Sequence, residues 1–288
     1  GTDASANFTG SGLGTASNRL LFTTAPTLTP ATTGILVRAT VNGSSFATYG
    51  ANGIAAFTAY NAASATNINS AAATDTVDAN AAMTTKGITA NRTINALRLS
   101  GGVAQTVSGS AFTQLTLTAG GVLATGAATH VLSVPVLNNA AVQNLFHVDT
   151  GSTLNVSSTI VSTAGAVKDG AGTLIISSPV NLAGIAGVNG NTATGNVTIA
   201  RGTIRLAGGR NTLTPGQFLI MGGPAATLDL NGLSQQISGL LTESSNPNSG
   251  GAIIGGAGSQ LIINQDNTGR NYAGMIGGSV SLVRSGQN

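Results

Sequence analysis

The chain of 288 residues contains no cysteine and no tryptophan, and only 7% of its residues are charged. The absence of cysteine excludes a disulfide-stabilised scaffold, a thiol nucleophile and a cysteine-type zinc site. Ordinary globular chains carry about 25% charged residues. The surface is therefore unlike that of a typical soluble enzyme, and the sequence predicts no catalytic, cofactor-binding or metal-binding residue.

Aromatic residues are also scarce, at 3% of the chain. Proteins that bind nucleic acid cluster Lys and Arg and interleave aromatic side chains that stack on bases. The isoelectric point near 9.8 reflects a surplus of only three positive charges among very few. We therefore expect no nucleic-acid partner.

Long hydrophobic runs and helical heptads are missing too. No apolar run approaches the roughly 18 residues of a membrane helix, and one glutamate with two lysines cannot supply coiled-coil heptads. The glycines lack the three-residue period of collagen. We expect no membrane-spanning segment, and we expect any export signal to have been removed or to lie outside this sequence.

Small and amide residues make up most of what is present. The chain has 41 Gly, 43 Ala, 39 Thr, 26 Ser and 26 Asn, together with 70 residues of Leu, Ile, Val or Phe. The branched apolar residues suffice for a long thin core, because a weakly folding chain is expected only below roughly 20% of such residues.

Apolar residues recur with period two in short bursts separated by Gly, Asn, Ser and Thr clusters, a pattern typical of strands with one buried face. Most bursts begin roughly 20 to 30 residues apart, and no helical pattern lies between them, so a βαβ sheet is not expected. The bursts are Leu97/Leu99, Leu115/Leu117, Leu132/Val134/Val136, Leu154/Val156, Leu174/Ile176, Ile204/Leu206, Leu228/Leu230 and Leu261/Ile263.

This spacing predicts an all-β fold, a parallel β-helix or β-solenoid of about a dozen stacked coils. Coils stack at the inter-strand distance of about 4.8 Å, where small residues fit and Thr and Val suit the pleated faces. Charge is scarce because like residues of successive coils lie above one another, and like charges so placed repel. The stacking of coils thus explains both the composition of the chain and the spacing of its apolar bursts.

Four segments carry a more specific resemblance. They resemble the autotransporter-associated β-strand repeat, also called the passenger-associated transport repeat, over about residues 165–288. The resemblance implies a right-handed β-helix that is secreted or displayed on a bacterial surface, without a known catalytic site. The segments are 168–177 (KDGAGTLIIS), 200–208 (ARGTIRLAG), 227–240 (TLDLNGLSQQISGL) and 272–286 (YAGMIGGSVSLVRSG).

The amino-terminal part has a different resemblance. Residues 35–100 are similar to the amino-terminal part of large secreted proteins that carry these repeats. We therefore divide the chain into an amino-terminal β-rich region of residues 1–100, a cap or an interface, and solenoid coils in residues 101–288. Residues 167–172 also match residues 283–288 as apolar, basic, polar, glycine, from which we expect the chain to be cut from a longer protein.

Candidate catalytic groups are few. Asp75 and Asp78 form the closest acidic pair, either a cation site or, as we prefer, a solvated loop. His147 and Asp149 could form a base oriented by a carboxylate, but two polar residues beside a turn is the simpler interpretation, and His130 has no acid nearby in sequence. No Gly-x-Ser-x-Gly elbow or phosphate loop occurs.

Two arginines lie on one of the predicted strands. Arg201 and Arg205 share the parity opposite to that of Ile204 and Leu206, so both should project outward, with Arg210 in the next turn. They could contact an acidic glycan or a neighbouring subunit. The simpler interpretation is a charged strand face that discourages wrong pairing.

The sequence favours a non-catalytic extracellular structural protein, a solenoid segment of a stalk or of a fibre. Solenoid ends expose unpaired strands, which must be capped or must pair with another copy, and no charged amphipathic helix is present to cap either end. We therefore expect self-association through the solenoid ends. The alternatives are an adhesin whose Thr and Asn ladders contact glycans or surfaces and, less favoured, a β-helix enzyme acting on polysaccharides, which would need convergent carboxylates.

Overall fold

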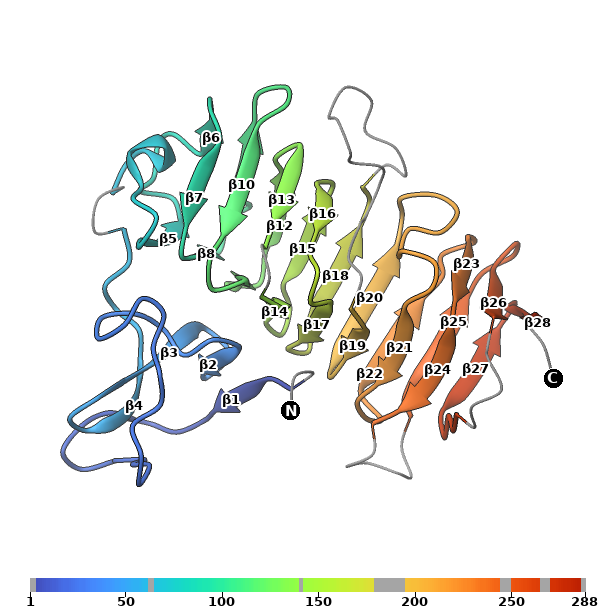
Figure 1. The fold of residues 1–288 in the computed structure, drawn as a ribbon, viewed down its shortest axis with the longest axis horizontal. Coiled ribbons are helices and arrows are strands. Elements are labelled where there is room, and N and C mark those ends of the chain that lie inside the picture. The colour runs from blue at the N-terminus through green and yellow to red at the C-terminus, as the bar shows by residue number, and fades with distance from the viewer. Residues whose placement is uncertain are drawn as a thin grey trace.

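The computed structural model describes residues 4–61, 65–139, 142–178, 195–243, 250–264 and 270–285. These residues form short strands and one 3-10 turn, η1 (Ile68–Ser70). The coils follow one another along the long axis of the molecule (Figure 1). The predicted all-β solenoid is confirmed.

Three parallel faces build the coils, which pass through them in the same order wherever all three carry a strand; residues 207–217 add no strand to the third face. The eight-stranded sheet contains β5 (Thr76–Ala79), β8 (Ala96–Leu99), β11 (Gly121–Ala124), β14 (Asn144–Val148), β17 (Ala166–Asp169), β19 (Val197–Ile199), β21 (Phe218–Met221) and β24 (Gly239–Thr242). The nine-stranded sheet contains β6 (Gly87–Ile88), β9 (Thr106–Gly109), β12 (Thr129–Ser133), β15 (Thr153–Val156), β18 (Thr173–Ile176), β20 (Gly202–Leu206), β22 (Ala226–Asp229), β25 (Ala252–Gly255) and β27 (Met275–Gly278). The third face contains β7 (Arg92–Ile94), β10 (Gln114–Leu117), β13 (Val136–Asn138) and β16 (Thr159–Val161), and farther along β23 (Ser234–Ile237), β26 (Gln260–Asn264) and β28 (Ser281–Ser285).

Coil length follows from the strand register. Thr76 pairs with Ala96 and Val167 with Thr198, so residues that stack are 20 to 31 positions apart. The predicted spacing is therefore correct. The expected dozen coils was wrong: the residues that the structure describes form about eight turns, because the first part of the chain does not enter the stack.

The core runs through the middle of the coils, and every burst predicted from the sequence contributes to it. In the nine-stranded sheet, Leu154, Leu174, Ile204 and Leu228 stack in register and are at most 2% exposed. The residues between them along each strand face outward and are partly exposed. Alternation with period two therefore identified the inward side chains correctly on this sheet.

Residues 4–57 form a separate small sheet of β1 (Ala6–Phe8), β2 (Ala39–Val41), β3 (Ser45–Gly50) and β4 (Gly53–Ala56). This amino-terminal segment packs on the outer face of the eight-stranded sheet, where Ile35 and Phe46 contact Ala96 and Leu123. Gly121 permits the approach, because a β-carbon there would lie 2.9 Å from the Phe46 ring. Figure 1 shows the segment beside the first half of the coils.

The amino-terminal end of the solenoid is covered. The side chain of Asn61 exchanges hydrogen bonds with the backbone of Asp78 on β5, and Ile68 N–H donates to Thr85 beside β6. Ile68 and Ala71 are buried against the core. The expectation of an uncapped end was therefore wrong at this end, because asparagine side chains and a 3-10 turn replace the amphipathic helix.

The domain division at residue 100 stays a prediction. Strands β5 to β8, within residues 76–99, pair with the solenoid sheets, whereas residues 4–57 pair among themselves. Residues 286–288, which belong to the internal match noted above, lie outside the described residues.

Substitutions of two adjacent side chains on β18 test which side of this strand faces the core. Replacing the buried Leu174 with alanine should lower the free energy of unfolding by about 2–5 kcal/mol, because a cavity forms inside the stack. Ile175→Ala, on the outward side of the same strand, should cost less than about 1 kcal/mol. Urea unfolding followed by circular dichroism measures both, and equal losses would contradict the assigned orientation.

Candidate functional site

A column of threonines runs along the outer face of the nine-stranded sheet. Thr129 stacks on Thr153, Thr153 on Thr173, Thr173 on Thr203, and Thr203 on Thr227. All five are partly or fully exposed, and their hydroxyls have no hydrogen-bond partner within the described part of the chain. The column therefore presents five regularly spaced hydroxyl and methyl groups to solvent.

Two pairs of opposite charges lie on adjacent coils of the outer faces. Arg205 stacks on Asp229, with Nε 3.5 Å from Oδ2, and its Nη2 donates to Asn231 at 2.6 Å. Arg98 stacks on Asp78, with Nη2 2.7 Å from Oδ2, and its guanidinium lies 3.7 Å from the Tyr60 ring centroid. Such pairing avoids the repulsion of like charges stacked in register.

The solvated loop expected at the first acidic pair was wrong. Asp75 and Asp78 are 7% and 4% exposed. Asp75 accepts a hydrogen bond from the Ala72 N–H at 3.1 Å, while Asp78 also accepts from the Ser100 hydroxyl at 2.7 Å. The Asp78 carboxylate therefore ties the first coils together, whereas the Asp75 carboxylate bonds within its own turn. The described residues contain no group of three or more His, Asp or Glu side chains placed to hold a metal ion.

A buried polar network lies where the amino-terminal segment meets the coils. His147 on β14 stacks on Asp169 of β17, and its Nδ1 donates to Asp169 Oδ2 at 3.2 Å. Arg201, which is half exposed, places Nε and Nη2 each 3.3 Å from Asp169 Oδ1. His147 is thus oriented by a carboxylate of the next coil, and Asp149 is not its partner.

The charge on Asp169 is stabilised by its neighbours. Burial alone would raise the pKa of this carboxyl group, but His147, the Gly170 N–H and Arg201 more than offset burial. Together they hold the pKa well below its ordinary value. Asp169 is therefore ionised throughout the neutral range and accepts hydrogen bonds from the side chains of His147 and Arg201.

Lys168 occupies an inward position of β17, stacked between Phe146 and Ile199. Its ammonium donates to the backbone carbonyls of Asp169, Gly170 and Arg201 at 2.8, 2.6 and 3.1 Å. Burial lowers its pKa to about 7, although the nearby Asp169 carboxylate opposes that shift. The lysine of the repeat-like segment thus ties a corner of one coil to the next.

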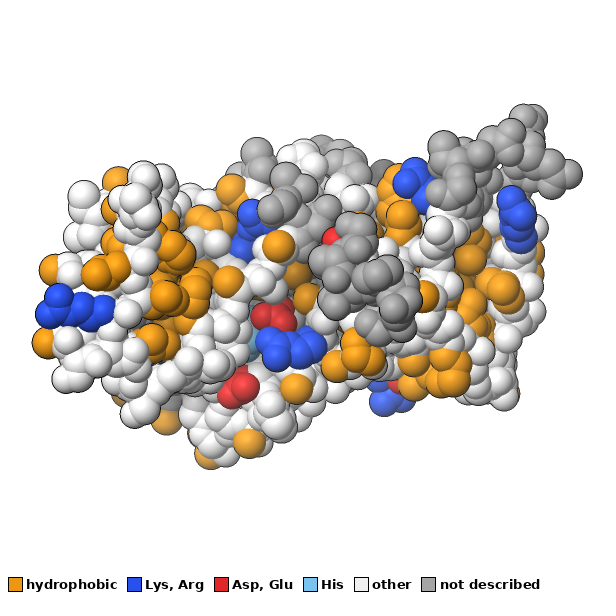
Figure 2. Space-filling view, turned by 90° about the horizontal axis from the view of Figure 1, so that it is seen from below, with side chains coloured by type: hydrophobic (Ala, Val, Ile, Leu, Met, Phe, Trp, Pro, Cys, Tyr) orange, Lys and Arg blue, Asp and Glu red, His pale blue; other side chains and the backbone are white. Residues whose placement is uncertain are grey.

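A polar pocket lies beside this network, between the amino-terminal segment and the coils. It has a volume of about 200 Å³, and its lining residues are Asn7, Thr9, Asn42, Gly43, His147, Asp149, Thr150, Gly170, Ala171 and Arg201. Figure 2 shows acidic and basic side chains gathered near the middle of a largely uncharged face.

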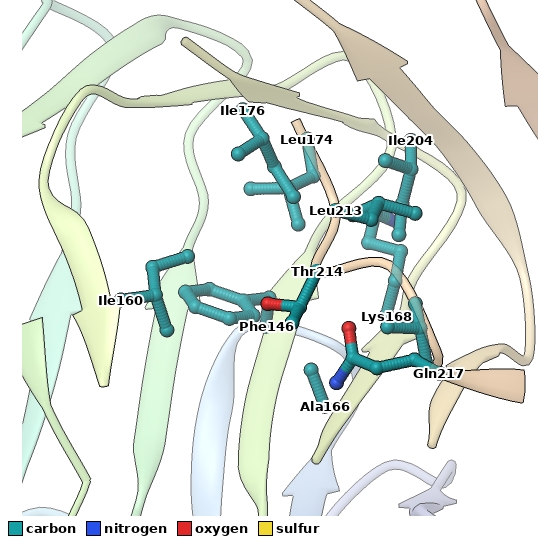
Figure 3. Close-up of a pocket in the computed structure, with 11 residues that line it drawn as sticks. Phe146, Ile160, Ala166, Lys168, Leu174, Ile176, Ile204, Leu213, Thr214 and Gln217 are labelled. Carbon is teal, nitrogen blue, oxygen red and sulfur yellow. The ribbon is translucent and has the colours of Figure 1, made fainter. Parts of the chain in front are cut away.

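A second cavity lies inside the coils and is apolar. Phe146, Ile160, Leu174 and Leu213 surround a space of about 30 Å³ beside Lys168 (Figure 3). A cavity that just holds one water molecule measures about 10–15 Å³ on the same scale. The cavity is a packing gap and has no room for an organic ligand.

The remaining candidates have structural partners or face solvent. His130 is buried, with Nδ1 accepting from the Gln105 N–H and Nε2 donating to the Thr125 carbonyl. Arg201 and Arg205 both project outward as predicted, each with 48% of its side chain exposed. Sequence reasoning missed the pairing of His147 with Asp169, and the signal that could have found it is the coil spacing of 22 positions between them.

Comparison with known proteins gives one informative similarity. The chain is 28% identical over 219 residues to the adhesin BmaC autotransporter of Brucella suis biovar 1 (strain 1330), which covers 72% of this chain and 6% of that protein. This similarity and the solenoid fold confirm the predicted resemblance to autotransporter passenger proteins. No protein-family model matches the chain, and no solved structure matches it. No helix in the described ranges is long and apolar enough to cross a membrane.

Replacement of Asp169 by asparagine tests the buried network. The folded-state pKa of Asp169 lies below the unfolded value of about 3.9, so its carboxylate stabilises the fold above that pH and loses this effect as the pH falls further. Asp169→Asn should therefore cost about 3 kcal/mol at pH 7, and the difference from wild type should shrink below about pH 4.

The matched control is Asp229→Asn, whose partner Arg205 is half exposed. Because exposed ion pairs contribute little, this change should cost less than about 1 kcal/mol at any pH. Unfolding in urea at several pH values measures both variants. A loss for Asp169→Asn that stayed constant from pH 7 to pH 3 would contradict the assigned role.

Proposed function

We propose that this chain is a non-catalytic segment of an extracellular bacterial adhesin and that its threonine column contacts a glycan or another polymer on a surface. The observation that carries this proposal is the exposed column from Thr129 to Thr227 with its unpartnered hydroxyls. The similarity to an autotransporter adhesin supports both the adhesive role and a secreted or cell-surface location.

The geometry of the column suits a polymer with repeating hydroxyl groups. Parallel strands are spaced about 4.8 Å apart, so successive threonines repeat at that distance along a stiff sheet. Each hydroxyl can both donate and accept a hydrogen bond, and each methyl group offers an apolar contact. Single contacts of this kind are weak, but a row of them on a rigid support adds up without the entropic cost of ordering long side chains.

Charge plays a small part in this contact. The column itself is uncharged, and the neighbouring Arg205 is already paired with Asp229. Binding through the column should therefore depend little on salt concentration, unlike the binding of a polyanion. This expectation favours a neutral polymer over an acidic one.

Self-association through the ends remains the second candidate. At the carboxy-terminal side, Met275 and Leu282 on β27 and β28 are 59% and 54% exposed, which favours a contact with a further coil. The opposite end carries the Asn61 and Ile68 cap, which disfavours the stacking of one copy on another. The stalk and fibre interpretations therefore stay predictions, and the adhesin interpretation ranks first.

The double variant Thr173→Val/Thr203→Val tests the column. Valine keeps the shape and the strand preference of threonine but removes two hydroxyls, so adhesion should weaken by at least about tenfold. Immobilised cellulose, chitin and a mammalian glycan array serve as the surfaces for the whole chain. The control is Thr93→Val/Thr116→Val, the same change on the third face. An absence of binding to every surface, or equal losses in both variants, would refute the proposal.

A further inference from the structure

We propose that the polar pocket beside His147 binds a single neutral sugar ring. This proposal deepens the adhesin function and rests on it for the biological context, but the pocket is separate from the threonine column. The pocket lies between the amino-terminal segment, which contributes Asn42 and Gly43, and the coils, which contribute His147, Asp149 and Arg201.

An imidazole nitrogen without a partner is the first observation. His147 is 1% exposed, and its Nε2 is buried without any hydrogen-bond partner, although the ring lines the pocket. With Nδ1 donating its proton to the ionised Asp169, Nε2 carries a lone pair whenever the ring is neutral. A buried polar atom without a partner costs free energy, so this lone pair favours a ligand that offers a donor.

A carboxylate faces the same space. A β-carbon placed on Gly43 would lie 2.9 Å from Asp149 Oδ1 and 3.3 Å from His147 Nε2, so both atoms surround one small volume. Asp149 Oδ1 accepts one hydrogen bond from the Thr150 N–H and keeps further acceptor capacity. Two acceptors in one place match a ligand with two adjacent O–H donors.

Arg201 supplies the complementary donor. Its guanidinium uses Nε and Nη2 for Asp169, which leaves N–H groups that can donate to a hydroxyl or ring oxygen in the pocket. The two acceptor atoms and the free N–H groups of Arg201 together fit two neighbouring hydroxyl groups of a pyranose. Each such hydroxyl can both donate and accept a hydrogen bond.

The size of the pocket and the charges that line it further restrict the class of ligand. The volume of about 200 Å³ lies below the roughly 300–1,000 Å³ of sites that hold drug-sized ligands, so one ring fits and an oligosaccharide would project out. The Asp149 carboxylate opposes an acidic sugar, and the Arg201 guanidinium opposes a divalent cation. A neutral sugar ring carries no charge that either of these groups would repel.

The two histidines of the chain allow a direct test, since their hydrogen-bond partners favour opposite neutral tautomers. His147 carries its proton on Nδ1, whereas His130 carries it on Nε2 and donates to the Thr125 carbonyl. Long-range ¹H–¹⁵N spectra of the whole chain report each ring nitrogen separately. Titration with the methyl glycosides of glucose, galactose, mannose and N-acetylglucosamine should shift His147 Nε2 for at least one of them in the millimolar range, while His130 stays unchanged.

Two variants locate the binding. Ala171→Leu places a larger side chain on the exposed rim of the pocket, and Asp149→Asn removes the charge of one acceptor while keeping an oxygen for the Thr150 N–H. Each should weaken the binding of the glycoside by about tenfold or more. Ala225→Leu, in an exposed turn outside the pocket, should leave binding unchanged.

Several results would overturn the proposal. It fails if no neutral glycoside shifts His147 Nε2, if Ala171→Leu binds as well as wild type, or if only methyl glucuronide or only Zn²⁺ produces the shift. The threonine-column variant separates this test from that of the proposed function, because it should lose surface adhesion yet keep glycoside binding. Loss of glycoside binding in that variant would also count against a separate pocket.

Discussion

Stacking in register is the constraint on which the rest of this structure depends. Each residue lies about 4.8 Å from the residue at the same position of the next coil, so a side chain must tolerate a near copy of itself. Branched apolar residues tolerate such stacking in the core, and threonine tolerates it on the outer face. Outward-facing charges have a partner of opposite sign on the adjacent coil at Asp78 with Arg98 and at Arg205 with Asp229. The low charge content follows from this rule.

The same constraint determines what the outer surface can recognise. A face that repeats every coil offers the same few groups again and again, which suits a repeating polymer better than a small molecule of irregular shape. The column from Thr129 to Thr227 is such a face. Its hydroxyls add contacts in proportion to the number of coils, so length itself becomes a determinant of affinity in a long adhesin.

The sequence predicted the strands and the core of the nine-stranded sheet well, because one side of that sheet is solvated and the period of two is visible. It predicted less about the eight-stranded sheet. There β11 and β14 are buried on both faces, one against the core and one in part against the amino-terminal segment, so the alternation disappears. The inward position of Lys168 and the pairing of His147 with Asp169 depend on register between coils, which single-strand patterns do not contain.

The amino-terminal segment also explains how a repetitive solenoid can hold a unique pocket. Stacked coils alone present flat or gently curved faces, and any hollow they form tends to recur from coil to coil. A segment that breaks the repeat and lies across several coils makes one place different from all others. Gly43 of that segment lies next to His147 and Asp149, and its lack of a side chain leaves the space open. We therefore expect a small ligand to bind where the amino-terminal segment interrupts the repeat. We expect a polymer to bind along the threonine column, where the repeat is most regular.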